Sequence, residues 1–166
     1  MPSAKIGLGG GCHWCTEAVF QSLKGVHKVE QGFVASDGAY SSFSEAVIVH
    51  FDEMIISLKN LISIHLHTHE STSQHSMRNK YRSAVYHFND KDQISSTQIL
   101  KEVQKDFDKK IITGVFSFRE FKPSDEMSRD YYFSDTEKPF CTTYITPKLK
   151  LLLSQFSEHV NKKVMV

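Results

Sequence analysis

Cysteine is scarce in this chain: three of its 166 residues, Cys12, Cys15 and Cys141. So small and odd a number argues against the disulfide framework of a small secreted protein. An excess of either charge is also absent, because 20 Lys and Arg stand against 19 Asp and Glu. The net charge of +1 gives no electrostatic reason to expect nucleic acid or a membrane surface as a partner.

Long apolar runs are absent as well, and no stretch of the sequence approaches the length that spans a bilayer. Residues 1–5 carry no signal-peptide pattern, so we expect a cytoplasmic protein that does not associate with membranes. With 40% hydrophobic residues the chain can bury a core without help from disulfide bonds or a structural metal. We find no internal repeat and no linker, and therefore expect a single domain over residues 1–166 and a monomer.

The most informative stretch is Gly9-Gly10-Gly11-Cys12-His13-Trp14-Cys15-Thr16-Glu17. Three consecutive glycines allow a sharp turn, and a helix that begins after them points its free N–H groups and positive dipole end at Cys12. Both effects favour the nucleophilic thiolate. A lone cysteine here would more simply be a small buried residue, but the second thiol at Cys15, one helical turn on, favours a reactive Cys12.

The hydrophobic pattern predicts an α+β fold. Its order is strand, helix, strand, strand, helix, strand, which is a split β-α-β (ferredoxin-like) core with an added C-terminal helix and an irregular tail. The predicted strands are 5–8, 26–35, 45–52, 82–88 and 112–121, and the predicted helices are 14–24, 58–67, 90–107 and 147–156. Ser57 and Thr146 are the predicted helix caps, and residues 122–144 are predicted to be irregular and aromatic-rich.

Four sequence blocks resemble the A-class peptide methionine sulfoxide reductases. They are the Gly-Cys12-His13-Trp14 turn, Ser44-Glu45-Ala46-Val47, Lys80-Tyr81-Arg82-Ser83-Ala84-Val85-Tyr86, and Tyr131-Tyr132 followed by Lys138-Pro139-Phe140-Cys141. They occur in the family's order with compatible spacing and span nearly the whole chain. The resemblance implies reduction of methionine S-sulfoxide, free or in peptides and proteins, to methionine.

The resemblance also implies roles for individual residues. Cys12 attacks the sulfoxide sulfur and becomes a sulfenic acid. Glu45 protonates the sulfoxide oxygen, for which it must keep a proton near neutral pH, and Tyr81 hydrogen-bonds that oxygen. Trp14 forms an apolar wall for the substrate methyl group. Without the resemblance, Glu45 would be interpreted as a solvated strand end, Tyr81 as a half-buried aromatic and Trp14 as a core residue.

The chain departs from the family pattern in three places. His13 replaces the usual Phe, which puts a titratable ring in the substrate-binding pocket. The Gly-Asn-Asp-His run that commonly precedes Tyr81 is absent, and residues 76–78 occupy that region. The segment that supplies a second oxygen-binding tyrosine is shortened, and Tyr40 lies in its region.

A second thiol must convert the sulfenic acid to a disulfide, which an external dithiol then reduces. Cys15 is one helical turn from Cys12, whereas Cys141 matches a family position used for recycling, so both candidates and a relay through both stay open. The expected reductant is thioredoxin or dithiothreitol, and we expect no bound cofactor and no metal.

Two other classes of function fit parts of the sequence. A general thiol-disulfide oxidoreductase would also use Cys-His-Trp-Cys, but it needs a proline loop facing the cysteines, and none of the four prolines lies in a central loop. A metal-binding module would use some of the nine histidines. The C-x-x-C pair has no second matching pair, however, and His65 lies on an apolar helical face.

Overall fold

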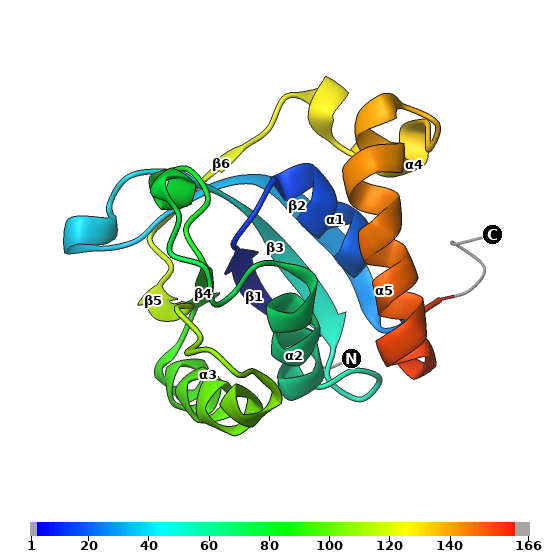
Figure 1. Cartoon of the computed structure of the whole chain (residues 1–166). Coiled ribbons are helices and arrows are strands. Elements are labelled where there is room, and N and C mark those ends of the chain that lie inside the picture. Colours follow the sequence, from blue (N-terminus) through cyan, green and yellow to red (C-terminus); the bar gives the residue numbers. More distant parts are fainter. Residues whose placement is uncertain (1–2, 162–166) are drawn as a thin grey trace.

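The computed structural model describes residues 3–161 as a six-stranded mixed sheet with helices packed against it (Figure 1). The strands are β1 (Ser3–Gly9), β2 (Val26–Ala35), β3 (Ser44–Asp52), β4 (Ala84–His87), β5 (Gly114–Ser117) and β6 (Glu120–Pro123). The α-helices are α1 (His13–Gln21), α2 (Leu58–Thr68), α3 (Asp90–Val103), α4 (Tyr131–Ser134) and α5 (Thr146–Phe156). No helix within these residues is long and apolar enough to cross a membrane.

The strands lie in the order β5-β4-β1-β3-β2-β6. All neighbours are antiparallel except β4 and β5. In a flat sheet the two edge strands would lie about 24 Å apart, five strand spacings. Only Phe118 and Arg119 separate β5 from β6 in the chain, too short a link to span that distance. The sheet is therefore curled so that its edges approach each other.

The prediction of one strand over residues 112–121 is wrong, because this segment supplies both edges of the sheet. Phe118 N–H donates to His87 of β4, whereas Arg119 N–H donates to Ala35 of β2. The chain therefore passes from one edge of the sheet to the other between Phe118 and Arg119. Inside the curl a small apolar cluster is formed by Val34, Ala46, Ala84 and Tyr86, with Phe116, Phe118 and Phe121 packed against it. A local pattern cannot specify such a crossing.

The main core lies on the other face of the sheet, beneath α1, α2 and α5 (Figure 1). The apolar stripe of α1 includes Cys15, Val19 and Leu23 just beyond its end, and all three are buried. The predicted cap of α2 is confirmed, since the Ser57 hydroxyl accepts a hydrogen bond from Asn60 N–H at 3.1 Å. In α3, which begins within the predicted helix 90–107, the apolar residue Ile94 is 72% exposed. It lies about 140° around the helix from Ile99, off the buried face.

The segment over 122–144 is more regular than predicted. It contains β6, a 3₁₀ turn (Glu126–Ser128), α4 and a π-helical turn (Cys141–Ile145) that runs directly into α5. Because that turn is continuous with α5, Thr146 does not begin the helix as its cap, which corrects the sequence prediction. Cys141 is fully buried in this turn, although a flexible tail was expected around it. Packing against α1 orders the segment.

Candidate active site

Cys12 lies where β1 turns into α1. The central strand β1 ends at Gly9, and Cys12 occupies the position before the first residue of the helix. Gly10 has φ +157°, and a Cβ there would lie 2.5 Å from the His69 ring, so the close approach of the two segments requires glycine. His69 is held by Ser83, whose hydroxyl lies 2.8 Å from its Nε2. The turn that presents Cys12 is therefore packed against a rigid support.

The two thiols of the motif have opposite electrostatic environments. A hydrogen bond from the Cys15 thiol is the main effect that lowers the pKa of Cys12, helped by the backbone N–H groups of Trp14 and Cys15. Burial and the charge of Glu45 act against it. The same hydrogen bond, followed by burial, raises the pKa of Cys15. Cys12 is the partly exposed member of the pair and Cys15 is buried. These environments favour a thiolate at Cys12 and a protonated thiol at Cys15.

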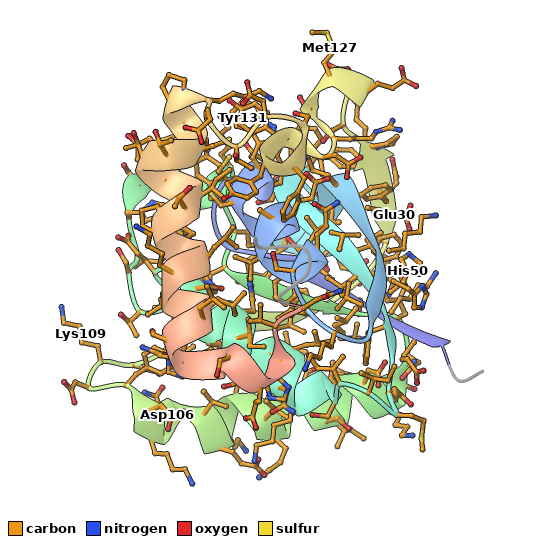
Figure 2. The ribbon with its side chains drawn as sticks, turned by 90° about the vertical axis from the view of Figure 1, so that its right-hand side faces the viewer. Glu30, His50, Asp106, Lys109, Met127 and Tyr131 are labelled. Carbon is orange, nitrogen blue, oxygen red and sulfur yellow. The ribbon has the colours of Figure 1, made fainter. Side chains whose placement is uncertain are left out.

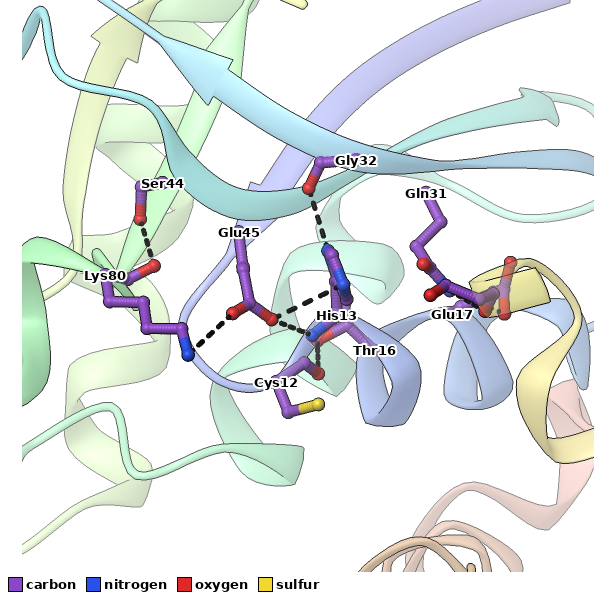
Figure 3. Close-up of polar contacts among 10 residues, drawn as sticks. Cys12, His13, Thr16, Glu17, Gln31, Gly32, Ser44, Glu45 and Lys80 are labelled. Atoms are coloured by element: carbon purple, nitrogen blue, oxygen red, sulfur yellow. Dashed lines mark hydrogen bonds and ion pairs between the residues drawn. The ribbon is translucent and has the colours of Figure 1, made fainter. Parts of the chain in front are cut away.

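Glu45 faces the N-terminus of α1 from β3 (Figure 3). Its Oε1 accepts a hydrogen bond from His13 N–H at 3.1 Å and lies 3.5 Å from His13 Nε2. Its Oε2 lies 3.6 Å from Lys80 Nζ. The side chain is only 6% exposed, so the carboxyl group is not the solvated strand end that the sequence alone suggests. Glu45 therefore lies beside the turn that carries Cys12 (Figure 3).

Tyr81 contacts Lys80, the residue that lies next to Glu45. Lys80 Nζ lies 5.1 Å from the centre of the Tyr81 ring. A hydrogen bond with Tyr81 is the largest cause that raises the pKa of Lys80, followed by the charges of Tyr81 and Glu45. The backbone fixes the segment as well, because Glu45 N–H donates to Lys80 C=O at 2.9 Å. Lys80 was not predicted as a site residue, although it lies directly before Tyr81 at the start of the sequence block 80–86 that resembles the family.

Trp14 forms one side of an aromatic wall with Tyr131 and Phe140. The Trp14 and Tyr131 rings are stacked with centroids 4.0 Å apart, and Phe140 meets Trp14 edge-on at 5.1 Å. Burial raises the pKa of Tyr131, and the negative charges of Cys141 and Cys12 raise it further. Tyr131 and Phe140 were not predicted as site residues. The sequence signal that could have identified them is the aromatic-rich segment 122–144, which contains both residues.

Cys141 lies behind the Cys12–Cys15 pair. It is fully buried, whereas Cys15 is 5% exposed. Burial raises the pKa of Cys141, and its charge contributes to the raised pKa of Cys15. The structure thus brings all three thiols into one region where α1 meets the turn before α5. All three are free thiols here.

Tyr40 is placed elsewhere. Its ring packs on Phe116 with centroids 4.4 Å apart, and the Arg82 guanidinium lies 5.6 Å from its centre. Phe116 belongs to the cluster inside the curl, whereas Glu45 faces the helices, because side chains alternate along β3. The structure therefore does not bring Tyr40 to Cys12.

The clustered histidines are engaged in other contacts. His65 Nε2 lies 2.8 Å from Gly9 C=O, and His67 Nε2 lies 3.3 Å from Asp106. Burial lowers the pKa of His65 to about 4. Over residues 3–161, no three His, Cys, Asp or Glu side chains are grouped to hold a metal ion. His65 thus acts as a neutral core residue under the catalytic turn.

A family model described as peptide methionine sulfoxide reductase matches residues 4–161. The chain belongs to this family. It is therefore an oxidoreductase that reduces methionine sulfoxide. The chain is 32% identical to the peptide methionine sulfoxide reductase MsrA of Campylobacter jejuni, over 90% of this chain and 98% of that one.

Solved structures of family members have the same fold. Mxr1 from Saccharomyces cerevisiae in reduced form superposes with a TM-score of 0.74 at 21% identity, over 86% of this chain and 91% of that one. Mxr1 in complex with Trx2 superposes with a TM-score of 0.63 at 21% identity, over 76% of this chain and 84% of that one. At these identities the superpositions establish the fold of this peptide methionine sulfoxide reductase but not its individual site residues.

Proposed function

We propose that Cys12 is the nucleophile that reduces methionine sulfoxide in this chain. Its thiolate attacks the sulfoxide sulfur while a proton reaches the sulfoxide oxygen. The oxygen passes to the Cys12 sulfur, which becomes a sulfenic acid, and methionine leaves. The observation that carries the proposal is that Glu45 accepts a hydrogen bond from the first N–H of the helix that Cys12 precedes, which sets a carboxyl group beside a thiol of lowered pKa.

Glu45 and Tyr81 serve the sulfoxide oxygen in this proposal. Glu45 is the acid, because its carboxyl group is buried and lies next to the turn that carries Cys12. Tyr81 supplies a hydroxyl donor next to Lys80. Trp14, with Tyr131 and Phe140, forms the apolar wall for the substrate methyl group. Tyr40 has no role in this proposal, because its ring packs on Phe116 in the cluster inside the curl.

For the second step we propose that Cys15 attacks the Cys12 sulfenic acid first, which forms a disulfide and releases water. The hydrogen bond between the two thiols and their one-turn separation support this order. Cys141 then exchanges into the Cys12–Cys15 disulfide, since it lies close enough to Cys15 to affect its pKa. A thioredoxin-like dithiol, or dithiothreitol in vitro, completes the cycle, as the Trx2 complex of Mxr1 suggests. Mass mapping of samples quenched during a single turnover tests the order: a Cys12–Cys15 bond with free Cys141 is expected first, and a disulfide that contains Cys141 is expected later.

We propose the S epimer as the substrate and a monomer of a single domain as the working unit. The order β4-β1-β3-β2 of the inner strands supports the description of the core as split β-α-β. A cytoplasmic location stays a prediction.

Turnover of both epimers of a blocked methionine sulfoxide with dithiothreitol tests the proposed function. The wild type should reduce the S epimer, and Cys12→Ser should reduce neither. Equal rates for the two proteins would exclude Cys12 as the nucleophile. Insulin reduction without sulfoxide reduction would favour a general thiol-disulfide oxidoreductase instead.

A further inference from the structure

The His13 side chain has a fixed hydrogen-bonding arrangement. Its Nδ1 lies 2.9 Å from the carbonyl oxygen of Gly32 in β2. A carbonyl oxygen only accepts hydrogen bonds, so Nδ1 carries a hydrogen. The other ring nitrogen, Nε2, faces Glu45 Oε1 at 3.5 Å. His13 is 7% exposed and its ring packs edge-on against Phe33, so the imidazole is held in this orientation.

This arrangement puts His13 Nε2 and Glu45 Oε1 in ion-pair contact. With Nδ1 protonated, a neutral His13 would point the Nε2 lone pair at a carboxylate oxygen, which is unfavourable in a buried site. One proton between Nε2 and Oε1 removes the conflict. Lys80 Nζ lies 3.6 Å from the other carboxyl oxygen, Oε2.

The other charged groups around the pair are few. Cys12 precedes His13, and its titration is affected by Glu45. Tyr81 lies on the far side of Lys80. Glu17, one turn further along α1, is turned toward Gln31 and the backbone of Asp130. The pair is thus set between one thiolate and one ammonium group.

We propose that His13 and Glu45 hold one proton between them and that this proton is the one delivered to the sulfoxide oxygen. His13 acts through Glu45 as a positioning residue that keeps the acid supplied near neutral pH, at a position where the family usually has Phe. The inference rests on the proposed role of Cys12 and goes beyond it by naming the source of the proton.

The step balances as follows. The Cys12 thiolate forms a bond to the substrate sulfur as the shared proton moves through Glu45 to the sulfoxide oxygen. The bond between substrate sulfur and oxygen then breaks, and the oxygen becomes bonded to the Cys12 sulfur as a sulfenic acid while the bond between the two sulfurs breaks and methionine leaves. The substrate sulfur is reduced by two electrons and the Cys12 sulfur is oxidised by two. The His13–Glu45 pair is left without its proton and regains one from solvent after methionine leaves.

The test is the pH dependence of kcat/KM with dithiothreitol for the wild type, His13→Phe and His13→Gln. Neither replacement can titrate, so the alkaline limb of the profile should move down by about one pH unit or more in both variants. At pH 8 the rate should fall by about tenfold, while at pH 5.5 it should stay close to that of the wild type. His50→Gln is the matched control, because His50 also contacts a glutamate, Glu30, but at an edge of the molecule apart from Tyr131 (Figure 2). The control should keep the wild-type profile.

An unshifted alkaline limb in His13→Phe, or an equal loss of rate at every pH, would overturn the inference. So would a wild-type profile for His13→Gln, which decides the matter if His13→Phe does not fold. A failure of the proposed function is distinguishable, because it would appear as turnover by Cys12→Ser, whatever the His13 profiles show.

Discussion

Glu17 should make the stability of this protein depend on pH. It is buried beside the site and accepts hydrogen bonds from Gln31 Nε2 at 3.0 Å and from the backbone N–H groups of Asp130 and Tyr131 at 3.1 and 3.3 Å. Glu17 therefore links α1 to the aromatic-rich segment 122–144 through the backbone of Asp130 and Tyr131. Burial is the main cause that raises the pKa of Glu17 from 4.5 to about 7, and the hydrogen bond from Asp130 N–H acts against it.

The sign follows from proton binding. Between pH 4.5 and about 7 the folded state binds more protons at Glu17 than the unfolded state does, so the free energy of unfolding falls as pH rises. The stabilisation is complete below pH 4.5 and is lost as the pH passes through about 7. The shift corresponds to about 3 kcal/mol. His65 and His69 act in the opposite direction, because burial lowers the pKa of each.

The comparison of wild type with Glu17→Gln isolates this effect, since the histidines are common to both proteins. Urea unfolding followed by fluorescence of the single tryptophan, Trp14, should be measured from pH 4.5 to 8. Because Trp14 stacks on Tyr131, its fluorescence reports directly on the contact between α1 and the segment 122–144. The stability of the wild type relative to the variant should fall by up to about 3 kcal/mol across this range. A constant or rising difference would refute the assignment.

Three other changes have defined outcomes. Gly10→Ala should destabilise the fold by about 2 kcal/mol or more in urea unfolding, because the new Cβ would lie 2.5 Å from the His69 ring; unchanged stability would contradict the close packing. Cys15→Ser should still release one equivalent of methionine in the first turnover, but its steady-state rate should fall by about tenfold or more, and a wild-type rate would exclude Cys15 as first resolver. Tyr131→Ala should raise KM about 2- to 10-fold by removing the stack on Trp14, and an unchanged KM would exclude it from the pocket.

The turn that carries Cys12 could be predicted from the sequence, because the residues that indicate it are neighbours in the chain. Glycines, a helix start and two thiols one turn apart define Cys12 within a few residues, and α1 begins at His13, directly after it. Assigning Glu45 and Tyr81 needed the family resemblance, since nothing local separates Glu45 from a solvated strand end. In the structure Glu45 accepts a hydrogen bond from the residue after Cys12, and Tyr81 contacts Lys80, which lies beside Glu45.

The remaining features depend on contacts between distant segments. The partner of His13 is set by the positions of β2 and β3, which bring Gly32 and Glu45 to one ring. The burial of Cys141 depends on how the last helix packs on α1. The separation of β5 from β6 depends on the curl of the whole sheet. None of these follows from the period of a local pattern.

The central claim is that Cys12 becomes the sulfenic acid. The most direct measurement is mass spectrometry after one equivalent of methionine S-sulfoxide is added, with dimedone as the trap, to a variant in which Cys15 and Cys141 are both serine. The account predicts one equivalent of methionine and one dimedone adduct on the peptide that contains Cys12. Release of methionine without an adduct at Cys12, or reduction by Cys12→Ser, would contradict it.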